Sequence, residues 1–126
     1  MAFYIESDAI YLTKGDDAVL ELNSITAQDG SEYELQAADV LTLTVRELPS
    51  TASPVLIQID SLPGSRRIVI RHEDTAEVNV GRYSADVQLT TSDSKRYTLW
   101  PNITGNNRYM VKNLNNFVIM PEVTAK

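Results

Sequence analysis

The first place where this sequence could do chemistry is His72-Glu73-Asp74, three consecutive titratable residues. His72 is the only histidine of the 126-residue chain, so any imidazole acid–base step would depend on it. A Ser-His-Asp arrangement is assembled in space rather than in sequence order, so it stays open as an alternative. The chain has no Gly-x-Ser-x-Gly elbow to support it. A surface histidine at the end of a strand is the simpler interpretation.

The overlapping stretch Asp74-Thr75-Ala76 distantly resembles the Asp-Thr-Gly of aspartic proteases. That chemistry needs two carboxylates sharing one proton. Here alanine stands in place of the glycine and the sequence has no second copy, so a homodimer would have to supply the second carboxylate. Helix capping explains the same residues more simply. We expect Asp74 or Thr75 to cap a short helical turn within residues 72–78.

Two acidic stretches offer oxygen ligands for a metal ion. Asp16-Asp17 and Asp29 could contribute to a calcium site, which needs several oxygens converging on the ion. Neither stretch has the spacing of a known calcium loop, and turn-forming aspartates are the simpler expectation. The chain also has no cysteine, which removes thiolate metal sites, cysteine nucleophiles and disulfides. We therefore expect no metal site.

Aromatic side chains could form a platform for sugar rings, and the candidates are Tyr97, Trp100 and Tyr109. We expect Tyr97 or Trp100 to fill the core instead, and Tyr109 to make contacts with a partner. No glycine-rich loop is present to cradle a phosphate group. Taken together, these residues predict a protein that is not an enzyme and has no cofactor.

Charge and composition exclude further classes of function. A net charge of -6 and a pI near 4.6 argue against binding to nucleic acid or to an anionic membrane through general attraction to phosphates. The first residues lack the basic start and apolar core of a secretion signal, and no apolar run approaches the length of a membrane span. We expect a soluble protein that is made in the cytoplasm.

The elements that would position these residues are strands. In residues 81–89, apolar and polar side chains alternate, which predicts a strand with one buried and one exposed face. Gly81-x-Tyr83 follows the helical turn, as in immunoglobulin-like sandwiches, where the tyrosine hydroxyl bonds back to nearby backbone and forms a tyrosine corner. Gly81, Tyr83 and Asp74 are therefore predicted to have structural roles.

Other alternating runs complete the predicted sheets. In residues 40–46, Leu41, Leu43 and Val45 face one way, and further strand-sized runs recur at roughly regular spacing. There is no room for the long amphipathic helices that parallel crossovers need. The sequence predicts an all-β fold, an immunoglobulin-like antiparallel β-sandwich with one short helical turn, as a single domain over residues 1–126.

The segment of residues 101–116 departs from this pattern. It is rich in asparagine around a small apolar island, Tyr109-Met110-Val111, and predicts a long protruding loop. Loops of this length inside compact domains are often functional. Tyrosine, arginine and methionine are enriched at interfaces, so we expect Arg108, Tyr109 and Met110 to contact a partner. A loop without any binding role is the open alternative.

Several pieces, taken in series, resemble a domain of bacteriophage and prophage tail and baseplate-associated proteins, namely the amino-terminal domain of baseplate upper proteins. The pieces are Gly15-Asp16-Asp17-Ala18, Tyr33-Glu34-Leu35, residues 39–46, Glu73-Asp74-Thr75, residues 81–89, Tyr97-Thr98-Leu99-Trp100-Pro101 and residues 117–124. The resemblance covers most of the chain from Gly15 to Thr124, and the Asn-rich segment departs from it.

The resemblance implies a virion structural protein that docks on other phage tail or baseplate proteins, often as several symmetric copies, after synthesis in the host cytoplasm. It carries no catalytic residues. Strand addition at an exposed sheet edge is one docking mode open to such a sandwich. A carbohydrate-binding or adhesin-like sandwich module is the alternative function, and an aromatic shelf flanked by Asp and Asn would favour it.

Overall fold

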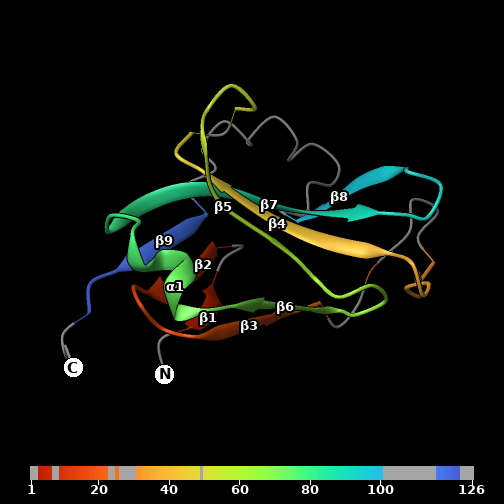
Figure 1. Ribbon diagram of the computed structural model, residues 1–126, viewed down its shortest axis with the longest axis horizontal. Coiled ribbons are helices and arrows are strands. Elements are labelled where there is room, and N and C mark those ends of the chain that lie inside the picture. Colours follow the sequence, from red (N-terminus) through yellow and green to blue (C-terminus); the bar gives the residue numbers. More distant parts are fainter. Residues whose placement is uncertain are drawn as a thin grey trace.

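The computed structural model describes residues 3–6, 9–22, 25, 31–48, 50–100 and 116–122. Figure 1 shows these residues as layered strands with one short helix. In chain order the elements are β1 (Phe3–Glu6), β2 (Ala9–Thr13), β3 (Ala18–Glu21), β4 (Val40–Arg46), β5 (Val55–Asp60), β6 (Arg67–Ile70), α1 (His72–Ala76), β7 (Gly81–Thr90), β8 (Arg96–Trp100) and β9 (Phe117–Met120). The predicted all-β sandwich-like fold with one short helical turn is confirmed.

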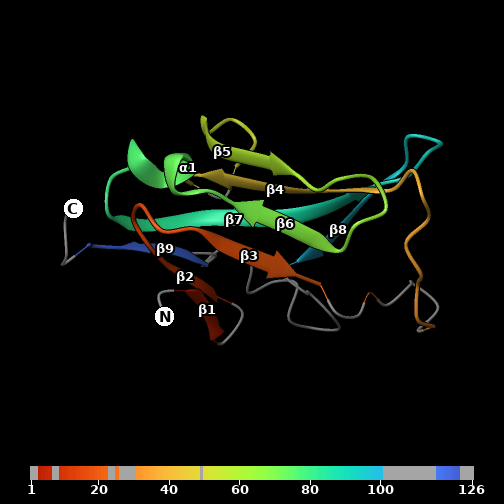
Figure 2. The ribbon, with the colours of Figure 1, turned by 60° about the horizontal axis from the view of Figure 1, so that its bottom comes forward.

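Two sheets of unequal size form the layers. The larger sheet runs in the order β1-β2-β9-β7-β4-β5, with β8 paired beside β7, and the smaller sheet pairs β3 with β6. β6 contacts both β4 and β5, and Figure 2 shows β3 and β6 lying across β7 and β4. One face of β4 and β7 is therefore turned toward the β3–β6 layer, and we call the opposite face the outer face.

One pairing differs from the antiparallel prediction. β2 and β9 are parallel, with Ile10 opposite Phe117 and Leu12 opposite Ile119, whereas every other pair of described strands is antiparallel. A parallel pair needs a long connection between its strands. Here the connection is nearly the whole chain, so no crossover helix is required.

Alternation along each strand places the core between the layers. On β4, Leu41, Leu43 and Val45 are fully buried, as the alternation predicts, while the residues between them are partly exposed. Burying such aliphatic side chains contributes about 1.5 to 3 kcal/mol each, which is the main stabilising term of a fold without disulfides. The rest of the core cluster is Ile10, Leu12, Leu20, Ile57, Ile68, Ile70, Tyr83, Ala85, Val87, Leu89, Phe117 and Ile119.

A tyrosine corner joins α1 to β7. The Tyr83 hydroxyl donates a hydrogen bond to the Asn79 carbonyl oxygen at 2.5 Å. This bond links the chain before β7 to the first residues of that strand. Gly81 lies beside the same ring, and a Cβ added there would be 3.6 Å from the hydroxyl, an ordinary contact distance. The tyrosine, and not a steric need for glycine, therefore fixes this corner.

The edge of β7 that faces away from β4 pairs with two different strands along its length. Residues Gly81 to Tyr83 pair with β9, and Val87 to Thr90 pair with β8. Between them, the Asn116 side chain accepts a hydrogen bond from the Ala85 N–H at 2.7 Å and donates one to the Ala85 carbonyl at 2.9 Å. Asn116, predicted to end the protruding loop, is instead buried because its amide replaces a strand in the ladder.

The helix α1 is a short connection between β6 and β7. α1 has five residues, and within the described parts of the chain no helix is long and apolar enough to cross a membrane.

Candidate functional site

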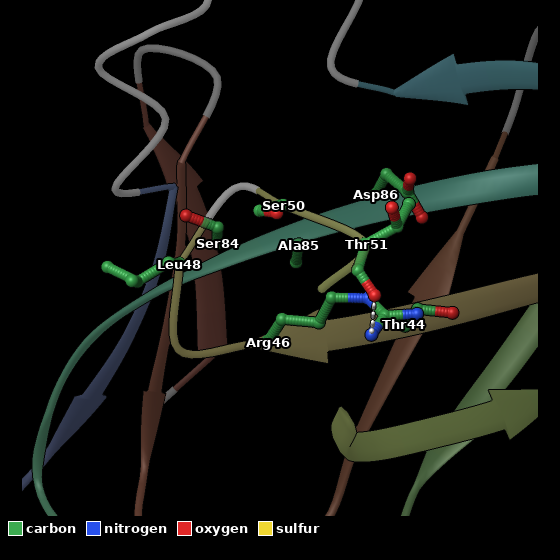
Figure 3. A pocket seen from close by; sticks show the side chains of 8 residues that line it. All are labelled: Thr44, Arg46, Leu48, Ser50, Thr51, Ser84, Ala85 and Asp86. Carbon is green, nitrogen blue, oxygen red and sulfur yellow. Dashed lines mark hydrogen bonds between the residues drawn. The ribbon is translucent and has the colours of Figure 1, made fainter. Parts of the chain in front are cut away.

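A hollow in the described surface lies on the outer face of β4 and β7, and we call it the outer-face pocket (Figure 3). Its volume is about 180 Å³. Two strands supply its floor and the β4–β5 loop supplies one wall, as Figure 3 shows. The lining residues are Thr44, Arg46, Leu48, Ser50, Thr51, Ser84, Ala85 and Asp86.

Arg46, the last residue of β4, holds the loop wall in place. Its Nη1 donates to the Ser53 carbonyl at 2.5 Å and to the Thr51 carbonyl at 3.3 Å. Ser53 is itself buried, and its hydroxyl oxygen accepts the Leu48 N–H at 3.2 Å. Charge-assisted hydrogen bonds of this kind are stronger than neutral ones. The guanidinium therefore fastens the loop to the end of the strand.

Asp86 is the one carboxylate among the described residues of the pocket lining. It lies on β7 opposite Thr44 and is half-buried. Its backbone is part of the β4–β7 ladder, but its carboxylate has no hydrogen bond or ion pair with a described residue. Burial raises the pKa of Asp86, and the nearby positive charge of Arg46 partly opposes this rise. The pocket thus contains a poorly compensated hydrogen-bond acceptor that is open to solvent.

The outer face of β7 is less exposed than the alternation predicts. Ser84, expected on the exposed face, is only 5% exposed. Strand alternation identifies which side chains share a face, but it does not reveal what folds over that face. Here the β4–β5 loop residues Leu48, Ser50 and Thr51 share the pocket with Ser84. The predicted exposed face is therefore partly covered.

Apolar side chains flank the pocket. Leu48 in the loop is 62% exposed, and Val55, the first residue of β5, is 44% exposed. Val55 pairs with Arg46 and so lies on the outer face as well. We call Leu48 and Val55 the apolar rim. A polar hollow beside exposed aliphatic side chains can receive a complementary protein surface.

His72, the first candidate from the sequence, lies outside this pocket. Its Nδ1 is 3.0 Å from Asp17 Oδ1 and its Nε2 is 3.3 Å from Glu73 Oε2. The Asp17 carboxylate raises the pKa of His72, and hydrogen bonds from His72 lower the pKa of Asp17. Because both ring nitrogens face carboxylates, neither is available to a hydroxyl nucleophile. The Ser-His-Asp alternative has no geometric support.

The Asp74-Thr75 stretch has a structural role, but the predicted cap position is wrong. The helix begins at His72 and its N-cap is Arg71, so Asp74 is the third helical residue. Its carboxylate accepts the Arg71 N–H at 2.7 Å, which closes the turn from inside. Thr75 is fully buried, and its hydroxyl accepts the Gly15 N–H at 2.9 Å. Both side chains therefore have structural roles, Asp74 within the helical turn and Thr75 in a contact with a distant segment.

The other candidates do not come together. In the described ranges, no three His, Cys, Asp or Glu side chains are grouped as a metal site would require. Asp29 and Tyr109, like the predicted contact residues Arg108 and Met110, lie outside the described residues. Of the two residues predicted to fill the core, Tyr97 or Trp100, Tyr97 on β8 is about half exposed and does not do so, and the side chain of Trp100 lies outside the described part of the structure.

Sequence inspection missed a second aspartate with a clear role. Asp39, which precedes β4, is 1% exposed. Its Oδ2 accepts hydrogen bonds from the Tyr33 hydroxyl at 2.5 Å and from the Gln36 N–H at 2.9 Å. The hydrogen bond to Asp39 raises the pKa of Tyr33 to about 12. Aspartate is a common turn residue, so the turn before β4 could have been predicted from Asp39. The sequence gives no sign that this aspartate is buried.

Comparisons of the chain with protein-family models, with curated proteins and with solved structures found no match.

Proposed function

We propose that this chain is a non-enzymatic docking domain that acts through protein–protein contacts, of the kind found in phage tails and baseplates. The observation that carries the proposal is the outer face of β4 and β7, where an open polar pocket lies beside the exposed apolar rim. The phage assignment comes from the sequence resemblance, which implies a component of the virion tail.

The composition of this face suits an interface. Leu48 and Val55 offer apolar area that the fold itself does not bury, while Arg46 and Asp86 on the strands of the pocket floor supply charged groups. Interfaces combine apolar contact with a small number of oriented polar groups. The Arg46 hydrogen bonds hold the loop in one conformation, and a preformed surface loses less entropy on binding.

Docking by strand addition needs an open strand edge, and the edge strands β5 and β8 of the larger sheet differ in this respect. β5 is protected, because Pro54 precedes it and a bulge at Leu56 interrupts its register with β4. β8 is more open: Arg96, Tyr97 and Thr98 are all exposed, and of the described strands only β7 pairs with it. Strand addition at β8 is therefore compatible with docking through the outer face.

The described structure gives the carbohydrate-binding alternative little support. Sugar sites use aromatic rings as stacking platforms. The lining of the outer-face pocket contains no aromatic side chain in the part of the chain that the structure describes.

Gene neighbourhood and direct binding test the proposal together. The genes on either side of this one should encode tail-tube, tape-measure or lysis proteins, and the purified chain should bind one of the neighbouring structural proteins in analytical size-exclusion chromatography with light scattering. A metabolic operon as the neighbourhood would overturn the phage assignment.

A charge placed on the apolar rim tests the surface. Leu48→Asp should weaken the complex with the neighbouring protein at least about tenfold, because it puts an uncompensated charge into a desolvated contact. Leu62→Asp is the matched control, since Leu62 is also strongly exposed but lies in the β5–β6 turn, outside the pocket lining. Equal loss in both variants, or in neither, would contradict docking through this face.

A further inference from the structure

We infer that the outer-face pocket receives the ammonium group of a lysine side chain from the docking partner, with Asp86 as its acceptor. The inference rests on the proposed function, because the lysine is taken to belong to a protein that docks on this face. It is carried by the unpaired state of Asp86 among the described residues, the size of the pocket and the charge of the chain.

Asp86 needs a donor that the described fold does not supply. The side chain is half-buried on β7, yet neither Arg46 nor a hydroxyl of the described lining donates a hydrogen bond to it. A carboxylate that loses solvation without gaining a partner is a costly arrangement, and an entering donor relieves it. The best donor is a charged one, because charge-assisted hydrogen bonds are the stronger class.

Arg46 cannot serve as that partner in its present position. Its Nη1 is committed to the Thr51 and Ser53 carbonyls of its own loop, and in the register of β4 and β7 it faces Ser84, not Asp86. The guanidinium therefore fixes the wall of the pocket while Asp86 remains open. An added cation would bind the far side of the carboxylate from Arg46.

The pocket has the size of one side chain. At about 180 Å³ it is smaller than the usual range for small-molecule sites, which begins at about 300 Å³. An ammonium group is compact and carries three donors, whereas a guanidinium has five in a planar fork and asks for more acceptors. The Thr44 hydroxyl already accepts a hydrogen bond from the Gln58 Nε2 at 3.2 Å and has a second lone pair, so Asp86, Thr44 and Thr51 can together accept three hydrogen bonds. Lysine fits this set better than arginine.

The surroundings favour a lysine in two further ways. The methylene stem of a lysine can lie along Leu48, an exposed apolar residue of the lining. The chain has a net charge of -6, so its long-range field attracts a cationic partner surface.

The test is an amide chemical-shift titration of the ¹⁵N-labelled full chain with Nα-acetyl-lysine N-methylamide. The amides of residues 84–87 should shift saturably, with a dissociation constant of about 1 to 10 mM, as expected for one isolated side chain. Nα-acetyl-norleucine N-methylamide, which lacks the ammonium, should produce no saturable shift. Equal shifts with both probes would overturn the inference.

Two variants locate the binding. Asp86→Asn keeps the shape of the side chain and should weaken binding of the lysine probe at least about tenfold, because the charge-assisted hydrogen bond is lost. Asp60→Asn is the matched control, since Asp60 pairs with Thr42 on the adjacent strand and lies outside the pocket. It should bind the probe as the native chain does. Unchanged binding by Asp86→Asn would refute the role of Asp86.

The docking assay separates this inference from the proposed function. If Asp86→Asn binds the neighbouring protein normally while Leu48→Asp does not, the lysine inference fails and the docking function stands. If the native chain binds none of the neighbouring proteins but still binds the lysine probe through Asp86, the docking function fails and the pocket assignment stands.

Discussion

Asp39 and Asp86 are two aspartates of the same sheet in opposite situations. Asp39 is almost fully buried just before β4, and its carboxylate accepts hydrogen bonds from the Tyr33 hydroxyl and the Gln36 N–H. Its own carbonyl accepts the Gly64 N–H at 2.8 Å. Asp86, in the middle of β7, is half-buried, and its carboxylate has no hydrogen bond to a described residue.

The difference shows how the surroundings divide one residue type between two tasks. A buried carboxylate is tolerated where its oxygens are hydrogen-bonded, and such a group then fixes the conformation around it. A carboxylate that is only half-buried can remain without a protein partner, because solvent still reaches it. Asp39 therefore belongs to the fold, and Asp86 is available to a ligand.

The largest expected effect comes from removing the buried member of the pair. Asp39→Ala leaves the Tyr33 hydroxyl and the Gln36 N–H without their acceptor, and should lower the free energy of unfolding by about 2 to 3 kcal/mol. Urea unfolding measures this. Asp60→Ala, at an exposed position on β5, should change it by less than about 0.5 kcal/mol. Similar effects at both positions would remove the distinction.

Tyr33 reports on the same site from the other side of the hydrogen bond. Tyr33→Phe should lower the free energy of unfolding by about 1 kcal/mol. Because the pKa of Tyr33 is raised from 10.0 to about 12 in the folded chain, its contribution is complete below pH 10.0 and is lost as the pH rises to about 12. Ultraviolet titration of native chain and variant checks this, and a Tyr33 titration near pH 10.0 would contradict it.

Asp86→Asn should raise the free energy of unfolding, whereas the substitutions of Asp39 and Tyr33 lower it. Burial raises the pKa of Asp86 above the ordinary 3.8, so the charged form costs the folded state stability as the pH rises through the raised pKa. At pH 7 the asparagine variant should be more stable by about 0.5 kcal/mol, a size common for partly solvated positions. Below pH 3.8 the difference should disappear, because Asp86 is then protonated in both states. Chemical unfolding at the two pH values decides; a loss of stability at pH 7 would mean that Asp86 has a partner.

Asp17, which is largely exposed, should give the smallest effect of the three aspartates. Asp17→Asn should lower the pKa of His72 toward 6.5, since the Asp17 carboxylate is the main cause of its rise. The raised pKa adds stability below pH 6.5, and this is lost as the pH rises through the folded value. Salt and solvent screen such an exposed pair, so the change in the free energy of unfolding should be too small to resolve. Proton NMR titration of the imidazole measures the shift, and an unmoved His72 would argue against the contact.

The sequence carried enough information for the inner face of the sheets. Alternation on β4 and β7 identified Leu41, Val45 and Val87 as inward, and they are fully buried, because a strand in a two-layer fold has to turn its apolar side to the other layer. The hydrogen bond of the Tyr83 hydroxyl is likewise local, reaching only four residues back to Asn79. Features set by neighbouring residues were within reach.

The outer-face pocket could not be predicted from the sequence, because it depends on contacts between segments that are distant along the chain. Arg46 and Asp86 were assigned to an exposed face, and only the register of β4 with β7 brings them to one hollow. Opposite charges on the polar side of two strands were the available signal. The parallel pairing of β2 with β9 was missed for the same reason.

Asn116 also has a consequence for how this chain can change. By completing the Ala85 hydrogen bonds with its own amide, it seals the seam between β8 and β9. An aliphatic residue at this position would leave the Ala85 N–H and carbonyl without partners, so few substitutions of Asn116 should be compatible with the fold.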